Sequence, residues 1–125
     1  FEQAEKSALF LKALGDLYIQ AGIYLCAQCR ASEAEPLYRQ SLAIRKRLLG
    51  NEHLDVAVCL NELAILCYDA GRYREAEPLY RQSLTMRKRL LEKNHPDVAL
   101  SLNNFAILYF TQGHISYDET FLIES

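Results

Sequence analysis

Apolar positions three and four residues apart recur along most of the chain, which is typical of amphipathic helices. Between residues 55 and 70 the apolar set is Val56, Leu60, Leu63, Ala64 and Cys67. Gly71 interrupts this pattern, as a glycine after a helix C-terminus does, and a second pattern runs from Ala76 to Leu91. A polar stretch, 92–95, then leads to Pro96, where the next helix is expected to begin. The pattern predicts a helix, a tight turn, a second helix and a loop; we name the helices A and B.

This helix pair is repeated along the chain. Residues 34–49 read AEPLYRQSLAIRKRLL and residues 76–91 read AEPLYRQSLTMRKRLL, so 14 of 16 positions are identical at an offset of 42 residues. The similarity continues at this offset through the following helix, from His53/His95 to Gly71/Gly113. We therefore predict an all-α array of helix pairs. Its units are expected at about residues 4–50 and 54–92, with a partial unit at about 96–123.

The second unit resembles the tetratricopeptide repeat, in the longer form found in kinesin light chains and nephrocystin-like proteins. The resemblance is carried by Leu60, Leu63, Ala64, Gly71, Tyr73, Ala76 and Tyr80, and by the stretches HPDVALSLNNFAILY and GRYREAEPLYRQSL. It covers about residues 9–114. What it implies is an α-solenoid, a right-handed superhelix of antiparallel helix pairs with the A helices on the concave side. It also implies a module that binds a protein or peptide.

The turn of unit one has two possible positions. Gly22 and Tyr24 match the Gly-x-Tyr turn at Gly71, which would place helix A at about residues 4–20 and lengthen helix B by seven residues, close to two helical turns. The alternative keeps the 42-residue offset and puts the turn at Cys29-Arg30. We prefer the first, because it retains the Gly-x-Tyr turn.

The third unit departs from the repeat after Gly113. Asp118 stands where unit two has Ala76, a small residue expected to pack between helices. We expect a short, irregular final helix after Gly113. Apolar residues in this segment are expected to cover the end of the array, namely Ile115, Phe121, Leu122 and Ile123.

The resemblance also assigns positions on the A helices that face the concave groove. In unit two they are Val58, Asn61, Ile65, Tyr68 and Asp69, and in unit three they are Leu100, Asn103, Ile107, Phe110 and Thr111. In unit one, with the turn at Gly22, they are Leu9, Lys12, Asp16, Ile19 and Gln20. An asparagine amide pairs with an extended peptide backbone, and Tyr and Phe supply apolar contacts. Asn is a poor helix former, so its recurrence at residues 61 and 103 needs a reason. The alternative is that these residues only pack against a neighbouring helix or face solvent.

Basic triplets end both B helices, at residues 45–47 and 87–89. With Arg39 and Arg81 they hold eight of the 14 cationic residues, and stacked units would align them into a ridge for a polyanion. The structural interpretation is preferred, because cations are favoured at helix C-termini and Glu35 and Glu77 balance them.

Cysteine and histidine are the remaining candidates for chemistry. Cys26 and Cys29 form a C-x-x-C motif, but two further zinc ligands at suitable spacing are missing and no strand precedes it, as a thioredoxin-like site requires. Cys59 and Cys67 fit small core residues. His53 and His95 hold equivalent positions before helix A, where a role at the start of the helix is expected. No catalytic triad or phosphate-binding glycine loop occurs, so we predict no enzyme, metal or cofactor.

Composition narrows the function further. The chain has 125 residues, is 50% hydrophobic and carries a net charge of −2, which fits one folded domain and makes nucleic acid an unlikely partner. It has no run of 18 apolar residues and no basic leader, so we expect no membrane segment and a cytoplasmic protein with reduced thiols. We predict a peptide-binding module of a larger scaffold or adaptor protein. The alternatives are a structural spacer that self-associates through its ends and a polyanion contact.

Overall fold

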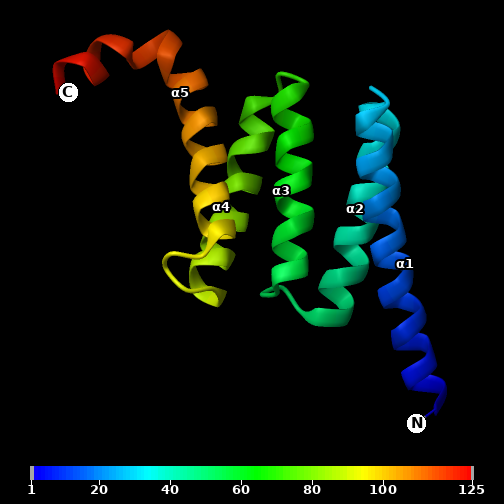
Figure 1. Ribbon diagram of the computed structural model, residues 1–125. Coiled ribbons are helices and arrows are strands. Elements are labelled where there is room, and N and C mark those ends of the chain that lie inside the picture. The colour runs from blue at the N-terminus through cyan, green and yellow to red at the C-terminus, as the bar shows by residue number, and fades with distance from the viewer. Residues whose placement is uncertain (1, 125) are drawn as a thin grey trace.

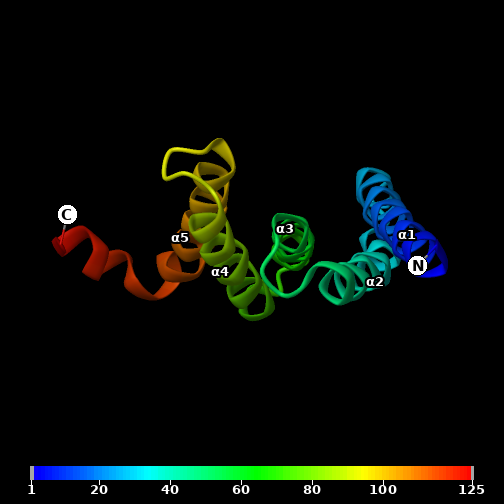
Figure 2. The same cartoon turned by 90° about the horizontal axis from the view of Figure 1, so that it is seen from below.

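The computed structural model describes the backbone of residues 2–124 and the side chains of residues 2–112. In this part of the chain the backbone forms five helices and no strand. They are α1 (Glu2–Ala27), α2 (Ala31–Leu49), α3 (Leu54–Asp69), α4 (Tyr73–Leu90) and α5 (Pro96–Glu124). The helices follow one another in a row from α1 to α5 (Figure 1), and α1 and α3 lie on one side of the row with α2 on the other (Figure 2). The predicted all-α solenoid of helix pairs is confirmed.

The turn of unit one lies at Cys29-Arg30, so the preferred turn at Gly22 was wrong. Cys29 has φ 60° and Gly71 has φ 78°, and they stand 42 residues apart in the same left-handed conformation. The hydrogen bonds agree: Arg30 N–H donates to Leu25 O at 2.8 Å and Arg72 N–H donates to the equivalent Cys67 O at 2.8 Å. Both turns thus close their A helix in the same way. Unit one has no seven-residue insertion.

Gly22 lies inside α1, where a tyrosine ring from α2 occupies the space beside it. A Cβ on Gly22 would lie 2.4 Å from Cε1 of Tyr38, which is 1% exposed. The equivalent pair in unit two is Ala64 and Tyr80, both in one core cluster. The glycine that looked like a turn signal is therefore a close-packing position between helices A and B.

The core consists of three clusters that all include α3. The first joins α1 and α2 to α3, the second joins α3 to α4 and α5, and the third lies between them. Their fully buried members are Ile19, Ala34, Tyr38, Cys59, Leu63 and Leu66; Ala64, Cys67, Ala76, Tyr80 and Leu108; and Val56, Ala57, Leu60 and Met86. Cys59 and Cys67 are core residues, as the helical pattern predicts.

Several identical residues of the repeated block make the same hydrogen bonds in both units. Ser41 O–H donates to Gly15 O at 2.8 Å, and Ser83 O–H donates to Ala57 O at 2.9 Å, tying each B helix to its own A helix. At the start of each following A helix a histidine Nδ1 accepts the N–H two residues on, from Asp55 to His53 and from Asp97 to His95, both at 3.0 Å. The expected role of both histidines at the helix start is confirmed.

The first arginine of each basic triplet is buried, so the triplets do not form one exposed ridge. Arg45 is 8% exposed and donates to Asp16 Oδ1 at 2.9 Å and to the Asp55 carbonyl at 3.1 Å, which connects α2 to α1 and to the start of α3. Arg87, 5% exposed, donates to Ser101 Oγ at 2.7 Å. The other arginines of the expected ridge that form ion pairs are Arg39 with Glu35, Arg81 with Glu77 and Arg89 with Glu52. These contacts support the structural interpretation of the basic residues.

An ion pair connects the turn of unit two to helix B of unit one. Arg72 donates to both carboxylate oxygens of Glu35, at 2.8 and 3.1 Å, and Arg39 donates to the same carboxylate. The Arg72 hydrogen bonds, with help from Arg39 and against partial burial, lower the pKa of Glu35 to about 2. A carboxyl whose pKa falls on folding stabilises the folded state only while it is ionised.

This pair predicts an acid-dependent loss of stability that a Glu35→Gln variant should lack. The contribution is fully present above the ordinary glutamate pKa of 4.5 and is lost as the pH falls toward the folded-state pKa of about 2. Urea titrations between neutral pH and pH about 2 should therefore show the variant less stable near neutrality, with the difference closing in acid. Glu92→Gln is the control, since Glu92 is exposed and makes no ion pair with the described side chains. A constant difference at all pH values would contradict the prediction.

The two ends of the array differ from its middle. α5 continues without a break to Glu124, so the separate helix expected after Gly113 does not form. The side chains expected to cover this end, Ile115 and residues 121–123, lie outside the described side chains. At the other end α1 exposes Leu17 and Tyr24, at 63% and 62%.

By length and composition alone, α1 is apolar enough to cross a membrane. The repeat accounts for this character. Gly15, Ile19 and Gly22 are buried against α2. Leu17 and Tyr24 stand 42 residues before Cys59 and Leu66, the residues of α3 that pack in the cluster with α2. The expected absence of a membrane segment stays a prediction.

Candidate functional site

One stripe of α3 is only partly covered by the neighbouring helices. The other sides of α3 carry the buried residues of the three core clusters. The remaining stripe consists of Val58, Glu62, Ile65 and Asp69, at intervals of four, three and four residues, which share one side of a helix. The first three are half-buried and Asp69 is exposed. We call this stripe, together with its equivalents on α1 and α5, the A face.

The equivalents follow from the 42-residue offset that the two turns establish. On α1 they are Asp16, Gln20, Ile23 and Ala27, and on α5 they are Leu100, Asn104, Ile107 and Thr111. Ile23 is 40% exposed and Ile107 is 45% exposed. Two rows therefore cross the three helices at neighbouring levels. The isoleucine row is Ile23, Ile65 and Ile107, and the polar row is Gln20, Glu62 and Asn104.

Hydrogen bonds fix the spacing of α3 and α5 beside the A face. The Asn104 amide donates to Asn61 Oδ1 at 3.3 Å. The Tyr68 hydroxyl lies 2.9 Å from Thr111 Oγ1, which itself donates to the Ile107 carbonyl, so Tyr68 is the donor to Thr111. These contacts hold the rows on adjacent helices in register.

At the α1 end, the A face carries an ion-paired carboxylate. Asp16 accepts from Arg45 at 2.9 Å and from Lys12 at 3.3 Å. The Arg45 hydrogen bond is the main cause that lowers the pKa of Asp16. Asp16 thus remains ionised and neutralised by its own chain, which leaves it a weak site for a further cation.

Comparison with known proteins agrees with this architecture. The sequence model of the tetratricopeptide repeat matches residues 13–89, which is more than half of the chain. The chain belongs to the tetratricopeptide repeat family. The crystal structure of BtubC (BKLC) from P. vanneervenii is similar in fold, with a TM-score of 0.74 at 22% identity. The match covers 79% of this chain and 40% of that one, so this chain spans less than half the length of BtubC. No curated protein sequence matches at a significant level.

The tetratricopeptide register divides the predicted groove residues into two sets. Those on the A face are Asp16, Val58, Ile65, Leu100 and Ile107, with Asp69, Gln20 and Thr111. Asn61 and Tyr68 lie on the flank of α3 that contacts α5, and Asn61 is only 3% exposed. An amide that is buried and already bonded is a poor site for a peptide backbone. Asn61 was therefore wrongly predicted as a peptide-contacting group.

The other predicted residues lie beside the A face. Asn103 and Phe110 are the equivalents of Asn61 and Tyr68, on the flank of α5 that points away from α3, and Phe110 is 59% exposed. Lys12 lies one turn before Asp16 and pairs with it. Ile19 is buried in the core. Lys12, Ile19 and Leu9 were assigned to the groove through the turn at Gly22, which the structure contradicts.

Three residues of the two rows were missed by sequence reasoning. Ile23 was hidden by the wrong turn of unit one. Glu62 and Asn104 follow directly after Asn61 and Asn103, and the repeated asparagines were taken as the signal instead. The pattern of burial around α3, not conservation between units, identifies Glu62.

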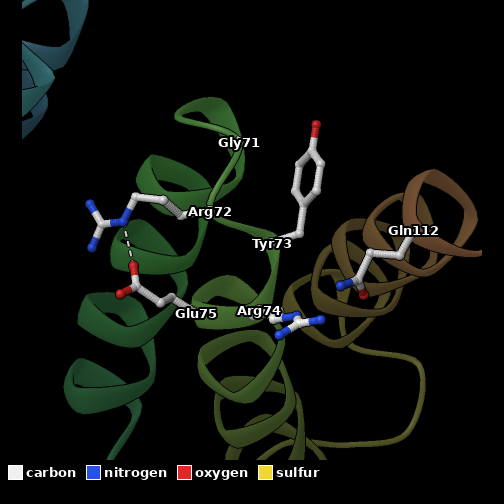
Figure 3. A pocket seen from close by; sticks show the side chains of 6 residues that line it. All are labelled: Gly71, Arg72, Tyr73, Arg74, Glu75 and Gln112. Carbon is white, nitrogen blue, oxygen red and sulfur yellow. Dashed lines mark hydrogen bonds and ion pairs between the residues drawn. The ribbon is translucent and has the colours of Figure 1, made fainter.

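A separate shallow pocket of about 460 Å³ lies at the turn of unit two. It is lined by residues 71–75 and Gln112, so it lies between the turn and α5 (Figure 3). Figure 3 shows Arg72 directed away from α5 and Arg74 directed toward it. Arg72 is held by Glu35 and Glu75. No predicted groove residue lines this pocket.

Proposed function

We propose that this tetratricopeptide array binds an extended segment of a partner protein across its A face. Repeats of this family generally mediate protein–protein interaction and form a non-catalytic fold. The observation that carries the proposal is the isoleucine row. It places one isoleucine on each of three successive A helices, at the same level, and two of them are 40% or more exposed.

The chemistry of the two rows suits an extended peptide. Isoleucine is no better than average as a helix former, so helix formation does not explain three of them at partly exposed positions. Apolar side chains of a bound segment would cover this row and remove its surface from water. The Gln20 amide and the Asn104 carbonyl oxygen supply hydrogen bonds for its backbone. A cytoplasmic partner, in keeping with the four free cysteines, belongs to the same proposal.

The test uses peptides selected from a random phage-displayed library on the wild-type protein. Ile65→Ser should weaken the selected peptides by about 2- to 5-fold, because covering a fully exposed isoleucine is worth about 1.5–3 kcal/mol and Ile65 is already half-buried in the free protein. Affinity is measured by fluorescence anisotropy, and retained helicity by circular dichroism.

Leu17→Ser is the matched control for this test. Leu17 is an exposed aliphatic residue of α1 on the outer end of the array and off the A face. Its replacement should leave affinity unchanged. Equal losses in both variants, or none in Ile65→Ser, would exclude the A face as the binding surface.

A second candidate function is self-association through the end of the array. The exposed outer side of α1, with Phe10, Leu17 and Tyr24, supports it. Such a surface fits another repeat or another chain. Sedimentation at rising protein concentration tests this second function. A chain that stays monomeric at every concentration does not self-associate through this surface.

A further inference from the structure

Glu62 is the one residue of the polar row that carries a charge, and nothing in the described chain pairs with it. It is half-buried at the centre of the A face and forms no hydrogen bond or ion pair with a described side chain. Burial raises the pKa of Glu62, and the Arg87 charge opposes this shift only in part. A carboxylate that is partly removed from water without a partner is costly in the unbound protein.

None of the described groups around Glu62 forms a hydrogen bond or ion pair with its carboxylate. From α4, Arg87 directs its guanidinium to Ser101 Oγ at 2.7 Å and to the Asp97 carbonyl at 3.5 Å. The Tyr38 hydroxyl of α2 donates to Cys26 Sγ at 3.5 Å. Burial raises the pKa of Tyr38 and of Tyr80, and the Glu62 carboxylate adds to both shifts, which places it within electrostatic reach of both helices. On α1 and α5 its neighbours in the row are the uncharged Gln20 and Asn104.

The charges of the A face are otherwise acidic or already neutralised. Asp69 is exposed one turn beyond Ile65 and forms no ion pair with a described side chain. Asp16 is paired with Arg45 and Lys12. The positions on α5 are uncharged. An acidic segment would meet two unpaired carboxylates here, whereas a basic one would meet no unpaired cation on the A face.

We propose that the segment bound on the A face is basic and apolar, with a lysine or arginine over Glu62 between apolar side chains that contact the isoleucine row. The inference rests on the proposed function, since it names the partner chemistry of that surface. An extended chain turns successive side chains to opposite sides. A segment that runs from α1 to α5 between the two rows therefore alternates apolar residues, over the isoleucines, with basic or polar residues over Gln20, Glu62 and Asn104.

The test compares three dye-labelled synthetic peptides in which leucine alternates with serine and the central polar residue is lysine, glutamine or glutamate. Wild-type protein should bind them in the order lysine, glutamine, glutamate, with about a 5- to 10-fold preference for lysine over glutamine at low salt. The preference should shrink as salt rises. It should also shrink in acid, because protonation removes the Glu62 charge, and this should begin above the ordinary glutamate range since burial raises the pKa of Glu62.

Glu62→Gln should bind the lysine and glutamine peptides equally, while Glu92→Gln, which removes an exposed carboxylate in the α4–α5 loop, should keep the preference. If the three peptides bind equally well, or the glutamate peptide binds best, the charge inference fails and the proposed function stands. If none of them binds the folded wild-type protein, both fail.

Discussion

Replacement of Gly22 by alanine should destabilise the chain by about 3 kcal/mol, although alanine is the better helix former. The added Cβ would lie 2.4 Å from Cε1 and 2.7 Å from Cδ1 of Tyr38. Tyr38 is 1% exposed and belongs to the core cluster of α1, α2 and α3, so its ring is surrounded by other side chains. Overpacking of this kind forces the helices apart. Urea unfolding followed by circular dichroism measures the loss.

Gly15→Ala in the same helix is the matched control. Its Cβ would lie 3.4 Å from Ile44 Cγ2, which is ordinary contact, so the gain in helix propensity of about 1 kcal/mol should remain largely intact. A Gly22→Ala, Tyr38→Leu double variant should recover part of the loss, because the smaller side chain makes room for the methyl group. If the two alanine variants have the same stability, Gly22 is not a close-packing position.

Arg45→Met should cost about 2 kcal/mol, more than a change at either other residue of the basic triplet of α2. Methionine keeps much of the apolar stem but removes the hydrogen bonds to Asp16, the Asp55 carbonyl and Cys59, at 2.9, 3.1 and 3.4 Å. The loss is smaller than for a fully buried ion pair, since the Asp16 side chain is 46% exposed and regains water. Urea midpoints at neutral pH give the difference.

Arg47→Met is the comparison from the same triplet. Arg47 is exposed and forms no ion pair with a described side chain, so its replacement should change stability by less than about 0.5 kcal/mol. If both variants lose a similar free energy of unfolding, Arg45 contributes no more than an exposed arginine, and the structural interpretation of the triplet is wrong.

The sequence predicts the helix pairs well because the repeat is read from periodicity and identity, both of which are local properties. In unit two, expected at about residues 54–92, the two predicted helices form as α3 and α4. The turn of unit one was misplaced because Gly has two uses, in turns and at close contacts between helices, and sequence spacing alone does not separate them at Gly22. The structure shows that Gly22 serves the close contact, because the Tyr38 ring packs against it, and this contact is known only once α2 is placed against α1.

The structure shows where each residue of the predicted groove lies, while its role in binding stays a prediction. Val58, Ile65, Leu100 and Ile107 were assigned to the groove by the family resemblance, and the structure places them on the A face. The groove role predicted for Asn61 was wrong because this position lies between the groove side of α3 and the side that packs against α5. In the structure Asn61 is bonded to Asn104 of α5, which sequence spacing alone does not reveal. Glu62 was not predicted because its lack of a partner is a property of three packed helices and not of any one of them.

The outer side of α1 has a consequence for the motions of the array. In a linear array each helix is held only by its nearest neighbours. α3 has neighbours on both sides, whereas α1 is held by α2 on one side and leaves Leu17 and Tyr24 in water on the other. In this chain local opening of α1 breaks one interface and opening of α3 breaks two, so we expect faster amide exchange in α1 than in α3. We therefore expect the amide of Ile23 to exchange faster than that of Ile65, so the proposed bound segment would contact one less protected and one more protected helix.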